Sequence, residues 1–201
     1  GSQYVPAMAM TSQGNSIVIW KDIIQNGIFG QRFSPEGNRI GGEFYTSAAT
    51  NSYTVNPDVA ISDSGAFVIA WEIGEMTDQD VFAKLFDANG LPIGGQILVN
   101  ENTPYIMRIA RVAIDDVGNF VVVWSENKSH YSHLLAQLYH ADGSTDGERI
   151  QVDTDNSERV YLGDVDMNGN GDFVITWSKD GTIYTRLYKN KDELFTKPSN
   201  L

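Results

Sequence analysis

The chain has 201 residues, of which 41% are apolar and 20% charged, so it can fold around a core of its own. Its net charge of −12 disfavours nucleic acid and anionic membranes as partners, because like charges repel. It has no cysteine, which excludes disulfides and thiolate chemistry, and no apolar run approaches the roughly 18 to 20 residues of a membrane helix, so we expect no membrane insertion.

The chain begins with Gly1 and Ser2, a pair typical of the scar left when a tag is removed. We therefore expect the natural start to lie elsewhere. A signal peptide is neither indicated nor excluded.

Four similar segments, each ending in tryptophan, recur along the chain. They read GNSIVIW (14–20), GAFVIAW (65–71), GNFVVVW (118–124) and GDFVITW (171–177). The tryptophans are 51, 53 and 53 residues apart, and a period near 50 is typical of propellers and solenoids. We read residues 1–201 as a single domain with repeats at about 4–52, 53–105, 106–158 and 159–201.

Each repeat predicts four short strands in the same order. The first strands are expected at 7–10, 58–61, 111–114 and 164–167, and each is followed by a glycine turn and the tryptophan strand. The third strands are expected at 28–33, 81–86, 134–139 and 183–188, and another turn leads to a fourth strand such as 96–100. Turn-bounded runs of this length, rich in Val, Ile, Phe and Tyr, indicate strands. Four antiparallel strands per repeat predict an all-β fold, a β-propeller of four blades.

The tryptophan strands of repeats 2 and 3 are apolar at successive positions, as in FVIAW and FVVVW. A strand with one face in water would alternate, so we expect both faces to be covered by neighbouring blades. Each tryptophan is then a packing wedge between blades rather than a platform for a ligand.

The fourth repeat is trimmed, because its last turn shrinks to KNKD (189–192). An atypical terminal repeat is typical of a finished array, and a closed four-bladed ring is the simplest interpretation. Two alternatives stay open: half of an eight-bladed ring completed by dimerisation, and part of a longer array.

Repeat 2 carries the fullest form of the pattern, NPDVAISDSGAFVIAW (56–71) followed by VFAKLFDANGLPIGGQILVN (81–100). It resembles β-propeller-type tandem repeats of large secreted or cell-surface bacterial proteins, which are adhesin-like, and the resemblance covers essentially the whole chain. It implies an extracellular or cell-surface module and brings no catalytic residues with it. Repeat 1 departs at Ser16, where the other repeats have Phe, and repeat 4 departs in its last hairpin.

The segment DMNGNGD (166–172) has oxygen-bearing side chains at alternate positions, as calcium loops do. The candidate ligands are Asp166, Asn168, Asn170 and Asp172. The repeat alignment favours a glycine-rich hairpin instead, because Asn168 to Gly171 occupy the turn that SDSG and DDVG make elsewhere. Apart from this calcium, or another ion in the channel, the sequence suggests no cofactor.

Asp166 aligns with Ala9, Ala60 and Ala113 on the first strands. If these strands line a central channel, a lone carboxylate among alanines needs a partner, an ion, or access to water at the channel mouth.

One tyrosine per repeat lies in the connection that leads into each first strand. These are Tyr4, Tyr53, Tyr105 and Tyr161. An aromatic ring can stack on a sugar, and the hydroxyl group adds a hydrogen bond, so these tyrosines are the candidate ligand-binding residues. The alternative is that they anchor long connections onto neighbouring blades.

The remaining polar residues predict no active site. His130 and His133 are expected at the surface, and the loop carboxylates Asp22, Glu72, Asp78 and Asp80 are expected to be solvated. Because no nucleophile triad, phosphate loop or dinucleotide fingerprint occurs, we expect a non-enzymatic module that binds a glycan or another surface protein. The alternatives are a structural or self-assembling unit, for instance a homo-oligomer, and, with the weakest support, a hydrolase.

Overall fold

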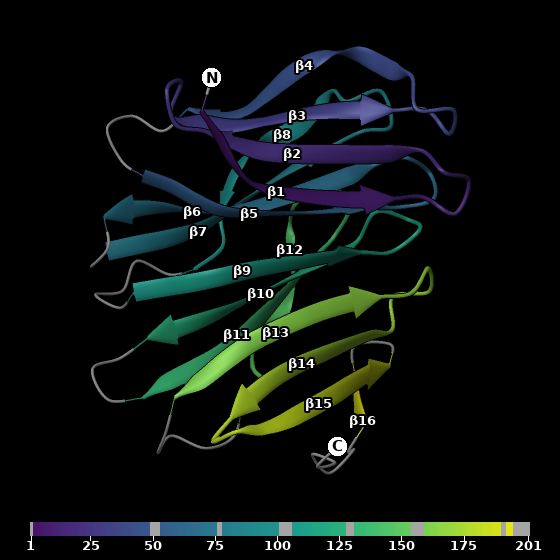
Figure 1. The fold of residues 1–201 in the computed structure, drawn as a ribbon. Helices are drawn as coiled ribbons and strands as arrows, with labels where there is room; N and C mark the ends of the chain where they lie inside the picture. The colour runs from purple at the N-terminus through teal and green to yellow at the C-terminus, as the bar shows by residue number, and fades with distance from the viewer. Residues whose placement is uncertain are drawn as a thin grey trace.

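The computed structural model describes residues 2–48, 53–75, 78–100, 106–127, 131–153, 159–189 and 192–194. These residues form strands and turns (Figure 1). No helix in this part of the chain is long and apolar enough to span a membrane.

The strands form four antiparallel sheets of four strands each, and every sheet uses its strands in chain order. Blade 1 holds β1 (Gln3–Met10), β2 (Ser16–Asp22), β3 (Gly27–Phe33) and β4 (Arg39–Ala48). Blade 2 holds β5 (Tyr53–Ile61), β6 (Phe67–Glu75), β7 (Asp78–Phe86) and β8 (Pro92–Leu98). Blade 3 holds β9 (Ile106–Ile114), β10 (Phe120–Asn127), β11 (Ser132–Tyr139) and β12 (Thr145–Gln151). Blade 4 holds β13 (Val160–Met167), β14 (Phe173–Lys179), β15 (Thr182–Lys189) and β16 (Asp192–Leu194). The prediction of four four-stranded antiparallel blades is confirmed.

The first turn of every blade is closed in the same way. A Thr, Ser, Asp or Asn begins the turn, and its N–H donates to the carbonyl four residues later, as from Ser62 to Ala66 at 2.8 Å. The glycine at the fourth position takes a positive φ, for example 89° at Gly65 and 94° at Gly118, where a side chain would be strained. This requirement explains the glycine before each tryptophan strand.

The four blades form an open arc. The first strands of the blades (β1, β5, β9 and β13) follow one another along its inside, and each contacts the next. Blades 1 and 4 lie at opposite ends (Figure 1), and within the described residues no extensive contact joins them. The closed four-bladed ring, the simplest interpretation of the sequence, is therefore not formed.

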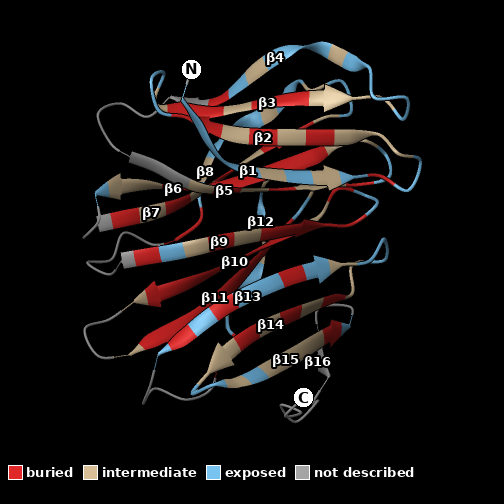
Figure 2. Cartoon of the chain, viewed as in Figure 1, coloured by how far each residue is buried: buried red, intermediate tan, exposed pale blue. Residues whose placement is uncertain are grey.

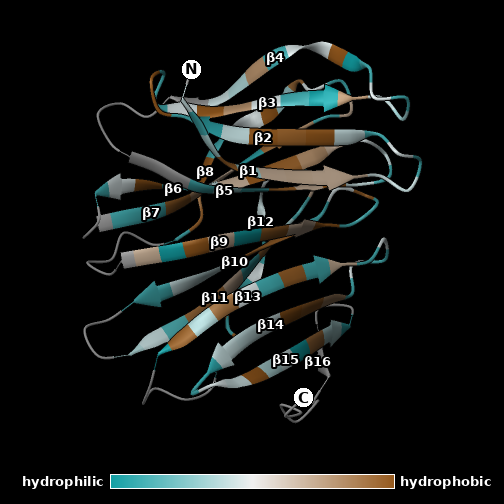
Figure 3. Ribbon diagram, in the orientation of Figure 1, coloured by the Kyte–Doolittle hydropathy of each residue, from teal (hydrophilic) through white to brown (hydrophobic). Residues whose placement is uncertain are grey.

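The described residues hold three hydrophobic cores, one between each pair of neighbouring blades. Figure 2 shows β10 and β11 buried almost throughout, whereas β1 and β13 have long exposed stretches. Apolar residues concentrate on the second strands, as Figure 3 shows for β2 and β14. Trp71, Trp124 and Trp177 are buried, which confirms the wedge prediction for these three, while Trp20 is only half-buried.

Candidate functional site

The four first strands of the blades, here called the inner strands, are each interrupted by a bulge. Their pairing with the second strands shifts between Tyr4 and Ala7 in β1 and between Val55 and Asp58 in β5, and similar shifts occur in β9 and β13. At the bulges Val5, Asn56 and Ile109 have φ near 50°, a strained conformation for Val and Ile. Because these three positions are equivalent in the repeat, the bulge is a fixed feature that divides each inner strand into a starting stretch and a second half.

The bulge in β9 is held by the carboxylate of Glu72. One oxygen accepts a hydrogen bond from the backbone N–H of Ala110 at 3.1 Å, and the other accepts from Asn56 Nδ2 at 3.1 Å. The carboxyl group is only 1% exposed, and burial raises its pKa despite these bonds and the nearby charge of Arg108. The loop carboxylates were expected to be solvated, and for Glu72 this is wrong.

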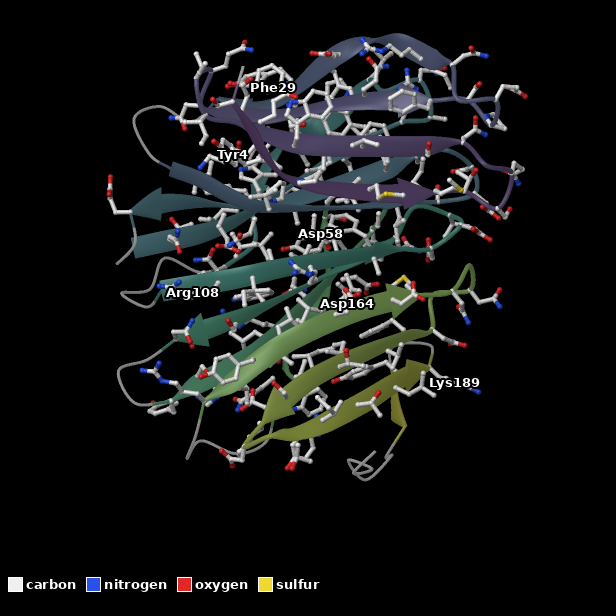
Figure 4. All side chains as sticks on the ribbon, in the orientation of Figure 1. Tyr4, Phe29, Asp58, Arg108, Asp164 and Lys189 are labelled. Carbon is white, nitrogen blue, oxygen red and sulfur yellow. The ribbon has the colours of Figure 1, made fainter. Side chains whose placement is uncertain are left out.

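The second halves of the inner strands line one groove of about 290 Å³. Residues 8–10, 58–61, 112–114 and 164–167 contribute, so all four blades take part. Three carboxylates belong to it: Asp58, Asp164 and Asp166. Figure 4 shows Asp58 and Asp164 near the middle of the inner strands, between the upper and lower halves of the molecule.

These carboxylates are not equivalent. Asp58 Oδ2 accepts a hydrogen bond from the N–H of Val112 on the next blade at 2.9 Å. Burial raises the pKa of Asp58, and the charge of Asp164 acts in the same direction, while that bond and Arg111 oppose the rise. Asp164 and Asp166 are exposed, and among the bonds of the described residues their side-chain carboxylates accept only the N–H of the following residue, at 3.0 Å each. The groove can therefore accept hydrogen bonds from hydroxyl or ammonium donors.

Asp166 was expected to stand alone among alanines. It does line the groove with Ala9, Ala60 and Ala113, but two further carboxylates share that groove. Sequence reasoning missed Asp58 and Asp164. The available signal was the Asp that begins both DVAI and DVDM, two positions before the aligned alanine or aspartate.

Tyr4, Tyr53 and Tyr161 lie at the other end of the inner strands, in β1, β5 and β13. Tyr4 is 53% exposed near the start of β1, and Tyr161 is 58% exposed near the start of β13. Tyr53 begins β5, but its side chain lies outside the described residues, as does the whole of Tyr105. Arg108 is exposed at the position of β9 equivalent to Tyr161, and Figure 4 shows Tyr4 and Arg108 toward this end. Tyr4, Arg108 and Tyr161 are therefore exposed on the starting stretches of β1, β9 and β13, on the other side of the bulges from the groove.

The segment 166–172 forms the hairpin between β13 and β14. Asn168 Oδ1 accepts the backbone N–H groups of Asn170 and Asp172 at 3.0 Å, and Asn168 Nδ2 donates to Asp172 Oδ2 at 3.3 Å. Asp115 uses its carboxylate in the same way in blade 3. Among the described residues, no three His, Cys, Asp or Glu side chains gather in a group that could hold a metal. Calcium at Asp166, Asn168, Asn170 and Asp172 stays a prediction.

His133 was expected at the surface, and this is wrong. It is 7% exposed, and its Nδ1 lies 3.3 Å from Asp153 Oδ2, whose other oxygen accepts the N–H of Leu134 at 2.6 Å. Asn100 closes blade 2 in the same way, accepting the N–H of Val81 at 2.7 Å. In blades 2 and 3, the Asn or Asp that follows the fourth strand therefore ties the chain to the third strand, and His133 contacts the carboxylate that does so in blade 3.

Asp22 was also expected to be solvated, and it too is buried. It is 3% exposed, and its Oδ1 accepts the N–H groups of Ile24 and Gln25 at 2.9 Å each. It closes the loop after β2, a structural role.

No protein-family model matches the chain, and no curated protein matches it in sequence. In structure it is similar to β-propeller proteins. An ulvan lyase of polysaccharide lyase family 25, solved with bound -[GlcA(1-4)Rha3S]-, has a TM-score of 0.66 and 6% identity, covering 96% of this chain and 54% of its own. A Penicillium chrysogenum α-L-arabinanase complexed with arabinobiose has a TM-score of 0.61 and 13% identity, covering 98% and 68%. A protein of unknown function from Dyadobacter fermentans has a TM-score of 0.61 and 9% identity, covering 96% and 67%.

These identities support the fold and nothing finer. The chain spans about half the length of the ulvan lyase, so its four blades correspond to part of a larger propeller. That agrees with the open arc.

Proposed function

We propose that this chain is a non-enzymatic binding module of a secreted or cell-surface bacterial protein, of the adhesin-like kind that its repeats resemble. Its ligand is a neutral oligosaccharide that lies along the inner strands. The observation that carries the proposal is the groove lined by all four inner strands, with three carboxylates in it and the exposed rings of Tyr4 and Tyr161 on the starting stretches of β1 and β13. Sugars are bound by this combination of ring stacking and hydrogen bonds to hydroxyl groups.

The negative charge of the molecule favours neutral glycans over acidic ones. Asp58, Asp164 and Asp166 line the groove, and the whole chain carries −12. An acidic polymer such as the GlcA-containing ligand of the ulvan lyase would meet like charge here, whereas a neutral sugar such as arabinobiose would not. Neutral sugars also offer the hydroxyl donors that carboxylates accept.

The groove carboxylates support binding rather than hydrolysis. Hydrolysis by two carboxyl groups needs one to donate a proton to the leaving oxygen while the other activates water or attacks. Asp58, whose pKa is raised, is tied by its carboxylate to the backbone of Val112 and so acts as a link between blades 2 and 3.

Isothermal titration with arabino-, xylo- and cello-oligosaccharides, and with an oligogalacturonate as the acidic counterpart, tests the proposal. We expect a neutral oligosaccharide to bind and the oligogalacturonate not to bind. Tyr4→Ala and Tyr161→Ala should each weaken binding by roughly tenfold or less, because an aromatic contact is worth about 0.5–1.5 kcal/mol. Asp164→Asn should also weaken sugar binding, because it removes a charged hydrogen-bond acceptor from the groove.

Leu91→Ala is the matched control, because Leu91 is 63% exposed in the turn between β7 and β8, away from the inner strands. Equal affinity of the tyrosine variants and the wild type would contradict the proposed surface. Release of shortened sugars during incubation would overturn the non-enzymatic assignment.

A further inference from the structure

Every interface between blades pairs two different faces. Blade 2 presents Phe67, Ile69 and Trp71 to Ile17 and Ile19 of blade 1. The same pairing recurs at the other two interfaces. Phe120, Val122 and Trp124 pack on Val68 and Ala70, and Phe173, Ile175 and Trp177 pack on Val121 and Val123. Each blade therefore has an aromatic face, which meets the preceding blade, and an aliphatic face, which meets the following one.

The aromatic face of blade 1 has no blade in front of it. Strand pairing places Met8, Met10 and Val18 on this face with Trp20 and Phe29. Met8 is 68% exposed, whereas the equivalent residues of the other blades are between 4% and 7% exposed. Those residues are Val59, Val112 and Val165. Met10 is 60% exposed, and Trp20 is the only half-buried tryptophan of the described part of the chain. This is an apolar surface without its usual cover.

The aliphatic face of blade 4 is open in the same sense. Val174, Thr176, Ile183, Thr185 and Leu187 share this face through the pairing of β14 with β15. Ile183 is 46% exposed, whereas its equivalents are fully buried. Those equivalents are Ile28, Val81 and Leu134. The face keeps small and aliphatic side chains like those on which the tryptophan faces pack inside the arc, with Thr176 and Thr185 where blade 3 has Val123 and Ala136.

We propose that a second copy of this chain covers both faces, with the aromatic face of each copy packed on the aliphatic face of the other. Two identical contacts then close an eight-bladed ring around a two-fold axis, and neither face remains exposed. A second copy is the expected partner because of the interfaces already present. At each of the three interfaces within the chain an aromatic face packs on an aliphatic face, and the two open faces are one of each kind. The chain covers 54% of the ulvan lyase chain, and the two end blades of its open arc lie apart from each other.

One polar contact fixes the register of this pairing. Asp58 accepts the N–H of Val112 on the next blade at 2.9 Å. Asp164 is the equivalent of Asp58, and Met8 is the equivalent of Val112. In the dimer, the carboxylate of Asp164 accepts the N–H of Met8 of the second copy. Head-to-tail contacts that did not close would build filaments, so a closed dimer is the arrangement that satisfies both ends.

Sedimentation velocity over a wide range of protein concentrations tests the proposal. We expect a species of twice the chain mass, and we expect Met8→Arg and Ile183→Arg each to abolish it. Both side chains are exposed in the single chain, so the variants should keep the wild-type circular dichroism. Leu91→Arg, a charge added at a residue 63% exposed in a distant turn, should leave the dimer intact.

Quenching of tryptophan fluorescence by acrylamide gives a second readout. Trp71, Trp124 and Trp177 are buried within the chain, so a fall in quenching on association reports Trp20. A wild type that stays monomeric at every concentration would overturn the proposal. So would a dimer that survives both arginine variants, or growth into open filaments. A wild type that stays monomeric and binds a different protein through the end faces of blades 1 and 4 would also overturn it.

Discussion

The tryptophan strands of blades 1 and 3 have almost the same sequence pattern, yet their surroundings differ. In β10, every residue from Phe120 to Glu126 is buried. In β2, Ile17 and Ile19 are buried while Ser16, Val18 and Trp20 are partly exposed. The difference comes from the neighbours, because β10 has a blade on each side and β2 has one. In this protein burial is a property of the array and not of the repeat.

The same comparison explains the loss of one aromatic residue. Phe120 stacks on Tyr139 at 4.7 Å, and Phe173 stacks on Tyr188 at 4.5 Å, in both cases on the face that meets the preceding blade. Ser16 stands at the equivalent position of blade 1, opposite Phe33. A polar residue is tolerated there because that position has no blade of the same chain against it.

The largest expected effect separates a tryptophan inside the arc from the one at its end. Trp124→Ala should lower the free energy of unfolding by about 3–5 kcal/mol, because it leaves a cavity in a fully buried core. Trp20→Ala should cost roughly 1–2 kcal/mol in the monomer, since this side chain is already partly exposed to water. Urea unfolding at low protein concentration measures both. Equal losses would break the comparison between inner and terminal blades.

A smaller effect separates the two equivalent aspartates. Asp58→Ala removes the acceptor of the Val112 N–H and should destabilise the monomer by about 1–3 kcal/mol. Asp164→Ala should change the monomer by no more than about 0.5 kcal/mol, because its side chain is exposed and reaches no other blade. Thermal unfolding of the two variants side by side gives the contrast. A large loss for Asp164→Ala in the monomer would show that this carboxylate already has a structural role there.

The sequence was sufficient for the repeat, the strands and the packing role of the tryptophans. These features depend on local patterns, such as the glycine turns at Gly65 and Gly118 and the double-sided apolar run of β10. It could not decide whether the array closes, because closure depends on the curvature of the arc, and no residue type encodes that directly. The trimmed fourth repeat suggested a closed ring and was misleading.

The site was predicted less well than the fold. Tyr4 and Tyr161 are exposed, but they lie within β1 and β13 and not in connections before them, because these strands begin earlier than the sequence predicted. The buried positions of Glu72 and His133 could not be read, because each is covered by residues distant in the sequence, Ala110 for Glu72 and Asp153 for His133. These partners are distant in the sequence, so they cannot be predicted from the positions of Glu72 and His133 along the chain.

The pH dependence of stability sharpens the comparison at the interface of blades 2 and 3. Burial raises the pKa of Glu72 above its value in the unfolded chain. Its contribution to stability is therefore fully present below the unfolded pKa and is lost as the pH rises through the folded pKa. Glu72→Gln cannot titrate. We expect the stability of the wild type relative to this variant to fall as the pH rises from about 4, the ordinary carboxyl range.

Urea titrations of both proteins at several pH values measure that difference. The exposed carboxylates whose pKa is lowered, such as Asp63 and Asp87, act in the opposite direction but are common to both proteins, so they cancel. A difference that is constant with pH would mean that Glu72 does not titrate differently in the native and unfolded states.

The smallest expected effect concerns the terminal hairpin 166–172. Because Asn168 Oδ1 already accepts two backbone N–H groups at 3.0 Å, this oxygen is committed to the turn rather than free for calcium. We expect the melting temperature to be the same with a chelator and with added calcium, and Asn168→Ala to cost about 1 kcal/mol, the worth of a turn hydrogen bond. Asp115→Ala in blade 3 is the matched control, since Asp115 makes the same turn with blades on both sides. A calcium-dependent rise in melting temperature that Asp172→Asn removes would show instead that the hairpin rearranges into an ion site, and that the terminal blade differs from the inner ones in chemistry as well as in burial.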